Sequence, residues 1–468
     1  MLLGGVHHKG ARQRPVHDRW TGAVIGSVAE DGPAEIDAAA ELLQGRRRVP
    51  PPAQRAEVLS KAAELLIAQA TDFAELITAE SGICRRETDR EVTRAAANLR
   101  VASAEALRIR GESIQLPSGD RLAVTLREPI GLVAAITPFN RPLNQVVVKV
   151  APAVAAGCPV LLKPSEQTPL TALRFAQLMF AAGLSPDTLA VATGQPGRIG
   201  AAVAGHPAVD MVAFTGSVRV GRQVAAAAAG KRQLLELGGN DPLFVLPDAD
   251  LADAVRLAGD GACATAGQSC RGVKRIIVWS EVADAFVEGL VDTVRRKVVG
   301  DPRLPDTDLG PLISEAAAVE VERRITEAMA AGAEHLVGGR RRGALLDPIV
   351  LDRVPANTEL VREETFGPVA PVLRVDGLDE AIEISNSTSF GLQAGVLTND
   401  LTAFWDLANR LRVGGVNLGE GPQFDSPYIP FGGVKASGVG REGIPYAVAE
   451  MTSIKTVTMP RSRGEGVR

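Results

Sequence analysis

The apolar positions divide the chain into segments with different periods. Over residues 36–43, 55–70 and 90–107, apolar side chains recur every three or four positions, which predicts amphipathic helices. Residues 1–30 hold only short apolar stretches and predict loops and short strands. Residues 113–130 contain turn residues and an alternating stretch, and they predict a β-hairpin between the helical part and the sequence that follows.

From residue 131 onward, short apolar stretches alternate with helical ones. The first series predicts helices at 142–156, 168–182 and 218–229, and strands at 131–136, 160–162, 189–192, 211–214 and 233–237. A second series predicts helices at 250–262 and 281–297, and strands at 243–246, 273–279, 370–375, 394–398, 415–417 and 452–458. Short apolar strands between such helices are typical of βαβ units and of a parallel sheet covered on both faces. The expected fold class is therefore α/β.

Composition narrows the class of protein. A chain of 468 residues predicts two or three packed domains, and its formal charge of −4 gives no basic footprint for nucleic acid. No apolar stretch approaches the length of a membrane span, and the first 20 residues lack the apolar core of a secretory signal. Four scattered cysteines predict no disulfide framework, and five scattered histidines suggest no metal site. We expect a cytoplasmic protein with no metal, no membrane and no nucleic-acid partner.

Cys270 is the first candidate for chemistry. It follows Ala266-Gly267-Gln268-Ser269 and precedes an expected strand, so it lies on a tight connection of the kind that displays catalytic side chains. The ordinary alternative for a lone cysteine is a small buried hydrophobic residue. We assign that alternative to the other three cysteines, Cys84, Cys158 and Cys263.

Two polar residues at strand ends are further candidates. Glu236 ends an apolar strand, where it is either solvated at the sheet edge or placed at the edge where parallel sheets bind ligands. Shielding from water would raise the pKa of this carboxyl group and suit it to act as a general base. Asn140 follows another strand and precedes a helix. It is either a helix N-cap or an amide donor to an oxyanion.

Two more segments occupy similar positions. Lys163-Pro164-Ser165-Glu166 follows a strand and is either a solvated loop or a site for ribose hydroxyls. Residues 214–221, Phe-Thr-Gly-Ser-Val-Arg-Val-Gly, join a strand to a helix start, where free N–H groups favour phosphate. This glycine spacing is not GxGxxG, so taken alone it is a weak signal.

Together these elements, in this order, resemble the aldehyde dehydrogenase superfamily. The resemblance covers about residues 29–457, and Cys270 follows Glu236 at the family's spacing of 34 positions. The matching segments are PFN at 138–140, KPSE at 163–166, FTGS at 214–217, ELGGN at 236–240, GQSC at 267–270, EETFGP at 363–368 and FGGVKASGVGREG at 431–443.

The resemblance implies a role for each matching residue. Cys270 would be the nucleophile, Asn140 with the Cys270 N–H an oxyanion hole, and Glu236 the base that activates water for deacylation. It implies a variant Rossmann domain for NAD, with NADP as an alternative, since Glu166 would repel a 2′-phosphate. The implied cofactor-binding residues are Lys163, Ser165, Glu166, Phe214, Gly216, Ser217, Leu237, Gly238, Glu364 and Phe366.

The resemblance also implies a division into domains. The NAD(P)-binding domain would comprise residues 1–112 and 131–239, and the catalytic α/β domain residues 240–436. Residues 113–130 and 437–468 would form a small β element for assembly into a homodimer or homotetramer.

Three arginines bear on the substrate. Arg141 follows Asn140, Arg271 follows Cys270, and Arg100 lies in a helix that often contributes to the family's substrate tunnel. A guanidinium group matches carboxylate, phosphate or phosphonate, so these residues favour a small aldehyde with an anionic tail. The alternative is that each pairs with a structural carboxylate. Asp425 would repel such a tail unless it pairs with an arginine.

The predicted reaction is NAD(P)-dependent oxidation of a semialdehyde, or of a phosphate- or phosphonate-bearing aldehyde, to the acid through a Cys270 thioester. Within the family, the matching segments are most similar to those of the lactaldehyde, semialdehyde and phosphonoaldehyde subgroup. A coenzyme-A-acylating semialdehyde dehydrogenase is an alternative, although acylating members generally lack the glutamate found here at 236. A non-catalytic cofactor-binding protein is the remaining alternative.

Overall fold

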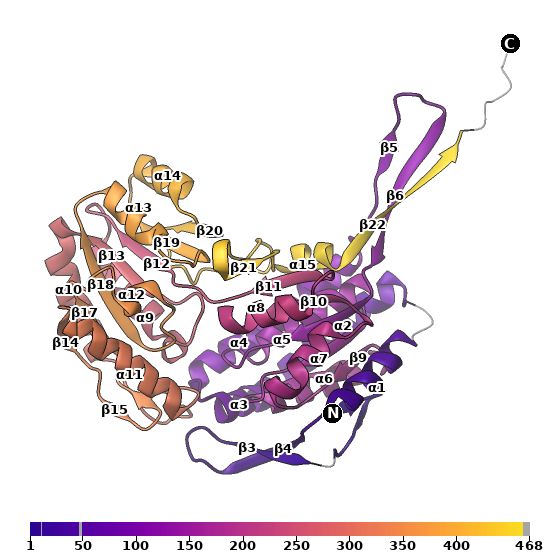
Figure 1. Ribbon diagram of the computed structural model, residues 1–468, viewed down its shortest axis with the longest axis horizontal. Helices are drawn as coiled ribbons and strands as arrows, with labels where there is room; N and C mark the ends of the chain where they lie inside the picture. The colour runs from indigo at the N-terminus through magenta and orange to yellow at the C-terminus, as the bar shows by residue number, and fades with distance from the viewer. Residues whose placement is uncertain (11, 46–48, 462–468) are drawn as a thin grey trace.

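The computed structural model describes residues 1–10, 12–45 and 49–461. Figure 1 shows two α/β bodies side by side and a narrow β arm that projects away from them. The predicted α/β class is confirmed. No helix in these described ranges is both long and apolar enough to cross a membrane.

The first body is built on an eight-stranded sheet. Its five central strands, β9, β8, β7, β10 and β11, are parallel, and antiparallel strands flank them on both sides. In the order of the sheet, the strands are β2 (Val6–His7), β1 (Leu2–Leu3), β9 (Leu189–Val191), β8 (Val160–Lys163), β7 (Leu132–Ile136), β10 (Val209–Thr215), β11 (Arg232–Glu236) and β21 (Gly438–Val439).

Alternate residues of these strands enter two separate cores. Val133 and Ala135 of β7 pack on one face, and Leu132 and Ala134 pack on the other. The first face is covered by α2 (Pro52–Ala68), α3 (Ala70–Ser81), α4 (Arg85–Ala106), α5 (Asn144–Ala156), α6 (Pro169–Ala181) and α15 (Ile444–Glu450). The second face is covered by α1 (Pro33–Gln44), α7 (Pro196–Gly205) and α8 (Val218–Ala227). Both faces are therefore buried, as the continuous apolar runs predicted.

The second body is built on a seven-stranded sheet that is parallel except for β14. In the order of the sheet, the strands are β14 (Glu334–Val337), β17 (Ile349–Asp352), β18 (Val369–Val375), β13 (Arg275–Trp279), β12 (Pro242–Val245), β19 (Gln393–Leu397) and β20 (Gly415–Leu418). Its helices are α9 (Leu251–Cys263), α10 (Ser280–Arg295), α11 (Glu315–Ala330), α12 (Glu359–Arg362), α13 (Leu378–Asn386) and α14 (Leu401–Arg410).

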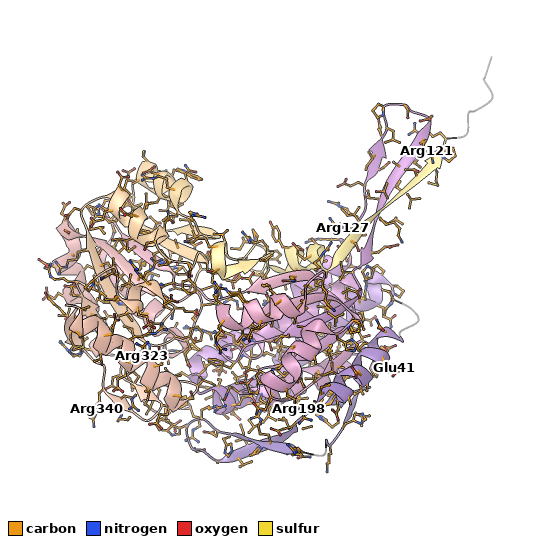
Figure 2. All side chains as sticks on the ribbon, viewed as in Figure 1. Glu41, Arg121, Arg127, Arg198, Arg323 and Arg340 are labelled. Carbon is orange, nitrogen blue, oxygen red and sulfur yellow. The ribbon has the colours of Figure 1, made fainter. Side chains whose placement is uncertain are left out.

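The arm is a three-stranded antiparallel sheet in the order β22, β6 and β5. The strands are β22 (Thr452–Pro460), β6 (Arg121–Pro129) and β5 (Ser113–Gln115). Figure 2 shows Arg121 and Arg127 on this projecting part. The segment 437–468, predicted as part of the assembly element, contributes β22 here. Its other described elements, β21 and α15, belong to the first body.

Small elements complete the chain. A hairpin of β3 (Gln13–His17) and β4 (Val24–Ala29) lies along the edge of the first body, and β15 (Arg341–Arg342) pairs with β16 (Leu345–Leu346). The predicted strands are confirmed, most of them to within two residues at each end. The sequence analysis did not predict helices α3, α7, α11, α12, α13, α14 and α15.

Candidate active site

The polar strand ends converge at one edge of the first sheet. Strands β8, β7, β10 and β11 are neighbours in that order and run parallel, so the residues that follow them meet at the same edge. Asn140 follows β7, Glu166 follows β8, Ser217 follows β10 and Gly238 follows β11. The second body lies against this edge, as Figure 1 shows.

Cys270 lies on a distorted connection from the second body. Helix α9 continues into a short 3-10 turn, η1 (Ala264–Gly267), in which Thr265 and Ala266 have positive φ angles of 56° and 52°. Such angles are unfavourable for side chains with a Cβ, and for a β-branched residue most of all. Both carboxylate oxygens of Glu87 accept a hydrogen bond from the Thr265 N–H at 3.0 Å, which holds this backbone in place.

A glycine is required beside that turn. Gly267 has a φ of +72°, and a Cβ there would overlap the backbone of Gly367. The buried Lys274 donates to the Gly267 carbonyl at 2.5 Å and to the Thr365 carbonyl at 3.0 Å. These contacts fix the segment from which Cys270 projects.

The Cys270 side chain lines a cavity of about 510 Å³ between the two bodies. Burial raises the pKa of the thiol to about 12, and the neighbouring Arg271 acts in the opposite direction. The resting side chain is therefore a neutral thiol. The cavity is lined by Arg86, Glu87, Arg90, Glu91, Arg94, Asn140, Arg141, Asn144, Gln145, Asp260, Cys263, Ala264, Ser269, Cys270, Arg271, Gly272, Lys297, Asp308 and Gln423.

Asn140 is tied to the segment before Cys270. Its Nδ2 donates to the Gln268 carbonyl at 2.9 Å, and the Gln268 side chain accepts from the Ile313 N–H at 2.9 Å. Asn140 and Cys270 line the same cavity. The amide, supplied by the first body, is thereby held beside the thiol supplied by the second.

Glu236 is shielded at the end of β11. It is 2% exposed, and neither carboxylate oxygen has a hydrogen-bond partner among the described residues. Burial and the nearby Glu442 carboxylate raise its pKa well above the usual range. Its charge also acts to raise the pKa of the Cys270 thiol, so the two groups are electrostatic neighbours.

Glu442 belongs to a buried ion pair beside this site. The Lys149 ammonium donates to Glu442 Oε1 at 2.6 Å and to Thr215 Oγ1 at 2.6 Å. Its positive charge lowers the pKa of Glu236, against the larger effect of burial. Sequence analysis did not single out Lys149 or Glu442, because each belongs to a segment that already had an explanation.

Glu364 belongs to the second body, and its side chain contacts the residues that follow β11 of the first body. Its Oε1 accepts from the Gly239 N–H at 3.0 Å, and a Cβ at Gly238 would overlap its other oxygen. Burial raises the pKa of Glu364 to about 7, against the opposing charge of Lys274. Phe366 packs edge-on against Phe139, with 6.0 Å between the ring centroids.

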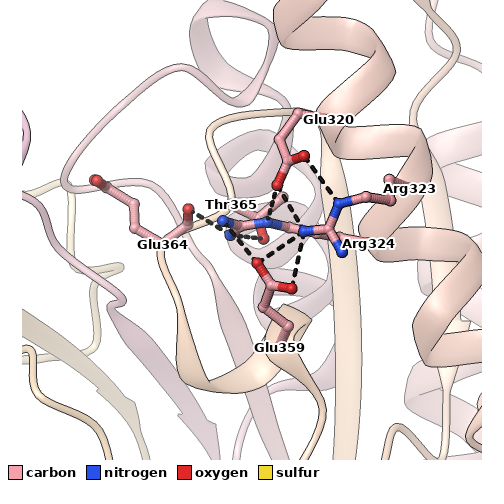
Figure 3. A network of polar contacts seen from close by, with 6 residues as sticks. All are labelled: Glu320, Arg323, Arg324, Glu359, Glu364 and Thr365. Atoms are coloured by element: carbon pink, nitrogen blue, oxygen red, sulfur yellow. Dashed lines mark hydrogen bonds and ion pairs between the residues drawn. The ribbon is translucent and has the colours of Figure 1, made fainter.

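A network of charged residues holds the backbone at Glu364 (Figure 3). Arg324 donates to the Glu364 carbonyl at 2.8 Å and to Thr365 Oγ1 at 3.2 Å. Glu320 and Glu359 form ion pairs with Arg324 at 3.0 and 3.1 Å. Arg324 is therefore a link between helix α11 and the EETFGP segment.

The remaining predicted cofactor residues also lie at the sheet edge. Lys163 is buried, and burial lowers its pKa. Its ammonium donates to the Pro164 carbonyl at 3.1 Å, which leaves two of its three donors without a partner among the described residues. Ser217 caps helix α8, and its hydroxyl accepts from the Val220 N–H at 3.4 Å. The others lie beside them, at Ser165, Glu166, Phe214, Gly216, Leu237 and Gly238.

The structure places two of the three predicted substrate arginines in the cavity. Arg141 donates to Thr265 Oγ1 at 2.7 Å and lies 3.7 Å from Glu87. Arg271 pairs with Asp425 at 2.9 Å and stacks over the Phe431 ring. The third, Arg100, is exposed and is not among the residues that line the cavity. Arg94, which the sequence analysis missed, lies there and pairs with Asp425.

No group of three or more His, Cys, Asp or Glu side chains in the described ranges is arranged to hold a metal ion.

Comparisons with known proteins show the family of this chain. A sequence profile described as "Aldehyde dehydrogenase family" matches residues 6–457. The 3-sulfolactaldehyde dehydrogenase of Priestia aryabhattai is 41% identical over 412 residues, which are 87% of this chain and 86% of that protein.

Two solved structures are also similar over nearly the whole chain. The NADP complex of glyceraldehyde-3-phosphate dehydrogenase from Methanocaldococcus jannaschii has a TM-score of 0.93 and 34% identity, covering 96% of this chain and 100% of that one. An NAD-dependent aldehyde dehydrogenase from Sinorhizobium meliloti has a TM-score of 0.94 and 34% identity, covering 100% and 95%. The chain therefore belongs to the aldehyde dehydrogenase family, the NAD(P)-dependent enzymes that oxidise aldehydes to carboxylic acids.

Proposed function

We propose that the protein oxidises a small aldehyde with an anionic tail to the acid, with Cys270 as the nucleophile. The observation that carries this proposal is the cavity itself. Cys270 and Asn140 line the same space of about 510 Å³ as the guanidinium groups of Arg94, Arg141 and Arg271. An aldehyde whose carbonyl group lies at the Cys270 thiol therefore has arginine side chains in the same cavity that can bind its anionic tail.

Catalysis begins at Cys270. The thiol is protonated at rest, so a base must take its proton as the sulfur attacks the carbonyl carbon. Glu236 is suited to this because shielding raises its pKa. The new C–S bond places negative charge on the aldehyde oxygen. The Asn140 amide and the Cys270 N–H stabilise that charge.

The acyl group is then released by water. NAD(P), when bound at the sheet edge, would supply the acceptor for the hydride that leaves the former aldehyde carbon. Cys270 then carries a thioester. After its first proton has passed to solvent, Glu236 takes a proton from water as the water oxygen attacks the thioester carbon. The C–S bond breaks to give the acid and the Cys270 thiolate, which takes the proton back from Glu236. The presence and burial of Glu236 support hydrolysis over transfer to coenzyme A.

The residues present fit a dinucleotide at the carboxyl edge of the first sheet. Lys163 has donors left for ribose hydroxyls, and the Glu364 carboxylate is held near the Cys270 segment by Gly239. The N-terminus of helix α8, at Ser217, offers free N–H groups to phosphate. We propose that Lys163, Ser165 and Glu166 hold the adenosine ribose, that Glu364 and Phe366 hold the nicotinamide end, and that Phe214, Gly216, Ser217, Leu237 and Gly238 line the path between them.

Assembly through the β arm is part of the proposal. Leu126 and Ile454 on the arm are 46% and 60% exposed, and Met459 at its end is also exposed. Exposed apolar side chains on a projecting sheet are typical of an interface. A homodimer or homotetramer would cover them. We also propose that residues 1–112 and 131–239 form the cofactor domain and residues 240–436 the catalytic domain.

A panel of aldehydes tests this function. Propionaldehyde, succinate semialdehyde, sulfoacetaldehyde and phosphonoacetaldehyde are each supplied with NAD and with NADP, and reduced cofactor is recorded at 340 nm. We expect kcat/KM to be highest for an aldehyde with an anionic tail, and Cys270→Ala to produce no reduced cofactor. Turnover that requires coenzyme A, or a preference for propionaldehyde, would contradict the proposal.

A further inference from the structure

One carboxylate joins two of the cavity arginines. Arg271 Nη1 lies 2.9 Å from Asp425 Oδ2, and Arg94 Nη2 forms an ion pair with that same oxygen. Arg94 comes from helix α4 and Arg271 from the segment after Cys270. Two guanidinium groups converging on one oxygen is the arrangement that an anionic ligand meets in an arginine site.

Three of the four other cations of the cavity, Arg86, Arg141 and Lys297, have carboxylate partners of their own, and Arg90 is the fourth. Arg86 pairs with Asp308 at 2.7 Å and Lys297 with Asp260 at 2.6 Å. Arg141 lies 3.7 Å from Glu87. Arg94 and Arg271 instead share Asp425. An anion entering the cavity therefore has to compete with a single carboxylate for these two arginines.

Asp425 lies in a segment without regular secondary structure. It belongs to residues 419–434, which contain no helix or strand in the described chain, between β20 and the 3-10 turn η2 (Lys435–Ser437). Arg94 is in the 22-residue helix α4, and Arg271 directly follows Cys270 in the segment held by the Lys274 hydrogen bonds. Displacing the aspartate requires a rotamer or loop change, and both arginines can stay in place.

We propose that Asp425 is an internal stand-in for the substrate's anionic tail, which displaces it from Arg94 and Arg271. This inference rests on the proposed function, because it assumes an anionic aldehyde at Cys270. Asp425 then acts as a specificity residue. It neutralises the two arginines until a tail replaces it, and it disfavours tails that bind arginine less strongly than a carboxylate does.

The test compares Asp425→Asn with the native enzyme. The substitution keeps the size of the side chain and removes the competing charge. We expect the ratio of kcat/KM for sulfoacetaldehyde to kcat/KM for propionaldehyde to rise about fivefold, the upper range for one partly exposed ion pair, mainly through a lower KM. Asp260→Asn is the matched control. This variant removes one negative charge from the cavity wall, and Asp260 pairs with Lys297, so the ratio should stay within about twofold of native.

A double-mutant cycle confirms that the effect passes through Arg94. In an Arg94→Gln background, removing Asp425 should increase the ratio much less than it does in the native background. An unchanged or lower ratio in Asp425→Asn, or an equal increase in Asp260→Asn, would overturn the inference. Native enzyme with no preference for sulfoacetaldehyde, succinate semialdehyde or phosphonoacetaldehyde would overturn the proposed function itself.

Discussion

Shielding from water affects Cys270 and Glu236 in different ways. For the thiol, burial favours the neutral form and delays its activation. For the glutamate, burial raises the pKa and so makes the carboxylate a stronger base near neutral pH. In the proposed mechanism, the same shielding from water keeps the Cys270 thiol neutral at rest and strengthens Glu236 as the base that takes its proton.

The raised pKa of Cys270 predicts how alkylation of the cofactor-free enzyme depends on pH. Because the thiol pKa lies near 12, the reactive thiolate fraction should grow about tenfold per pH unit between pH 7 and 9. Iodoacetamide labelling of the peptide containing Cys270, followed by mass spectrometry, measures this rate. Cys270→Ala corrects for reaction at the buried cysteines. A rate that levels off between pH 7 and 8 would show a thiol with a low pKa instead.

Arg94 and Arg100 show what residue-level sequence reasoning missed. The two positions are six residues apart on helix α4, about 240° around the helix axis, so only one of them faces the cavity. Glu91 shares the buried side with Arg94, and its carboxylate accepts from the Leu143 and Asn144 N–H groups. Glu91 and Arg94 are three positions apart on helix α4, so they lie on the same side of the helix. That spacing is the sequence signal that could have identified Arg94 in place of Arg100.

At the level of elements, the sequence was most informative where strands end. The apolar runs predicted β7, β8, β10 and β11, and the polar residues after them are at the edge where the site forms. Helices α11, α13 and α14 lie in segments for which the sequence analysis made no prediction. Contacts between the two bodies, such as Asn140 with Gln268, depend on packing and have no signal in local sequence.

Arg324 of helix α11 should support cofactor binding through Glu364. Arg324→Met removes its bonds to the Glu364 carbonyl and Thr365, and we expect the Kd for NADH to rise about tenfold, the effect of losing one hydrogen bond to a charged donor. NADH fluorescence titration measures this without turnover.

Arg323→Met is the matched control for that titration. Arg323 pairs with Glu320 and Glu359, as Arg324 does, but it is half exposed and lies on the far side from Glu364 (Figure 3). Exposed ion pairs contribute little free energy, so the Kd of the Arg323→Met variant for NADH should stay near the native value. Equal effects of the two substitutions would show that helix α11 acts only through general stability.

At the scale of the whole molecule, two bodies each contribute part of one site. The first supplies Asn140, Glu236 and the sheet edge proposed for the cofactor, and the second supplies Cys270 and Glu364. The cavity lies where they meet, so its shape depends on their packing. The arm lies away from this junction.

A substitution in the β arm should change the oligomeric state and leave the active site unchanged. Ile454→Lys places a charge on an exposed apolar position of β22, and we expect a smaller particle by light scattering after size-exclusion chromatography. Lys455→Ala is the control, since that side chain already pairs with Glu128 within the arm. An unchanged mass in Ile454→Lys would place the interface elsewhere.

The convergence of Cys270, Glu236 and Asn140 on one carbonyl is tested most directly by trapping the acyl group. Glu236→Gln keeps the shape of the side chain and removes the base of both steps, so thioester formation should slow, and the thioester should accumulate once formed because water is no longer activated. After mixing with NAD and sulfoacetaldehyde, intact mass spectrometry should show one acyl group per chain, and peptide mapping should place it on Cys270. Sustained turnover by this variant, or an adduct on another residue, would contradict the account.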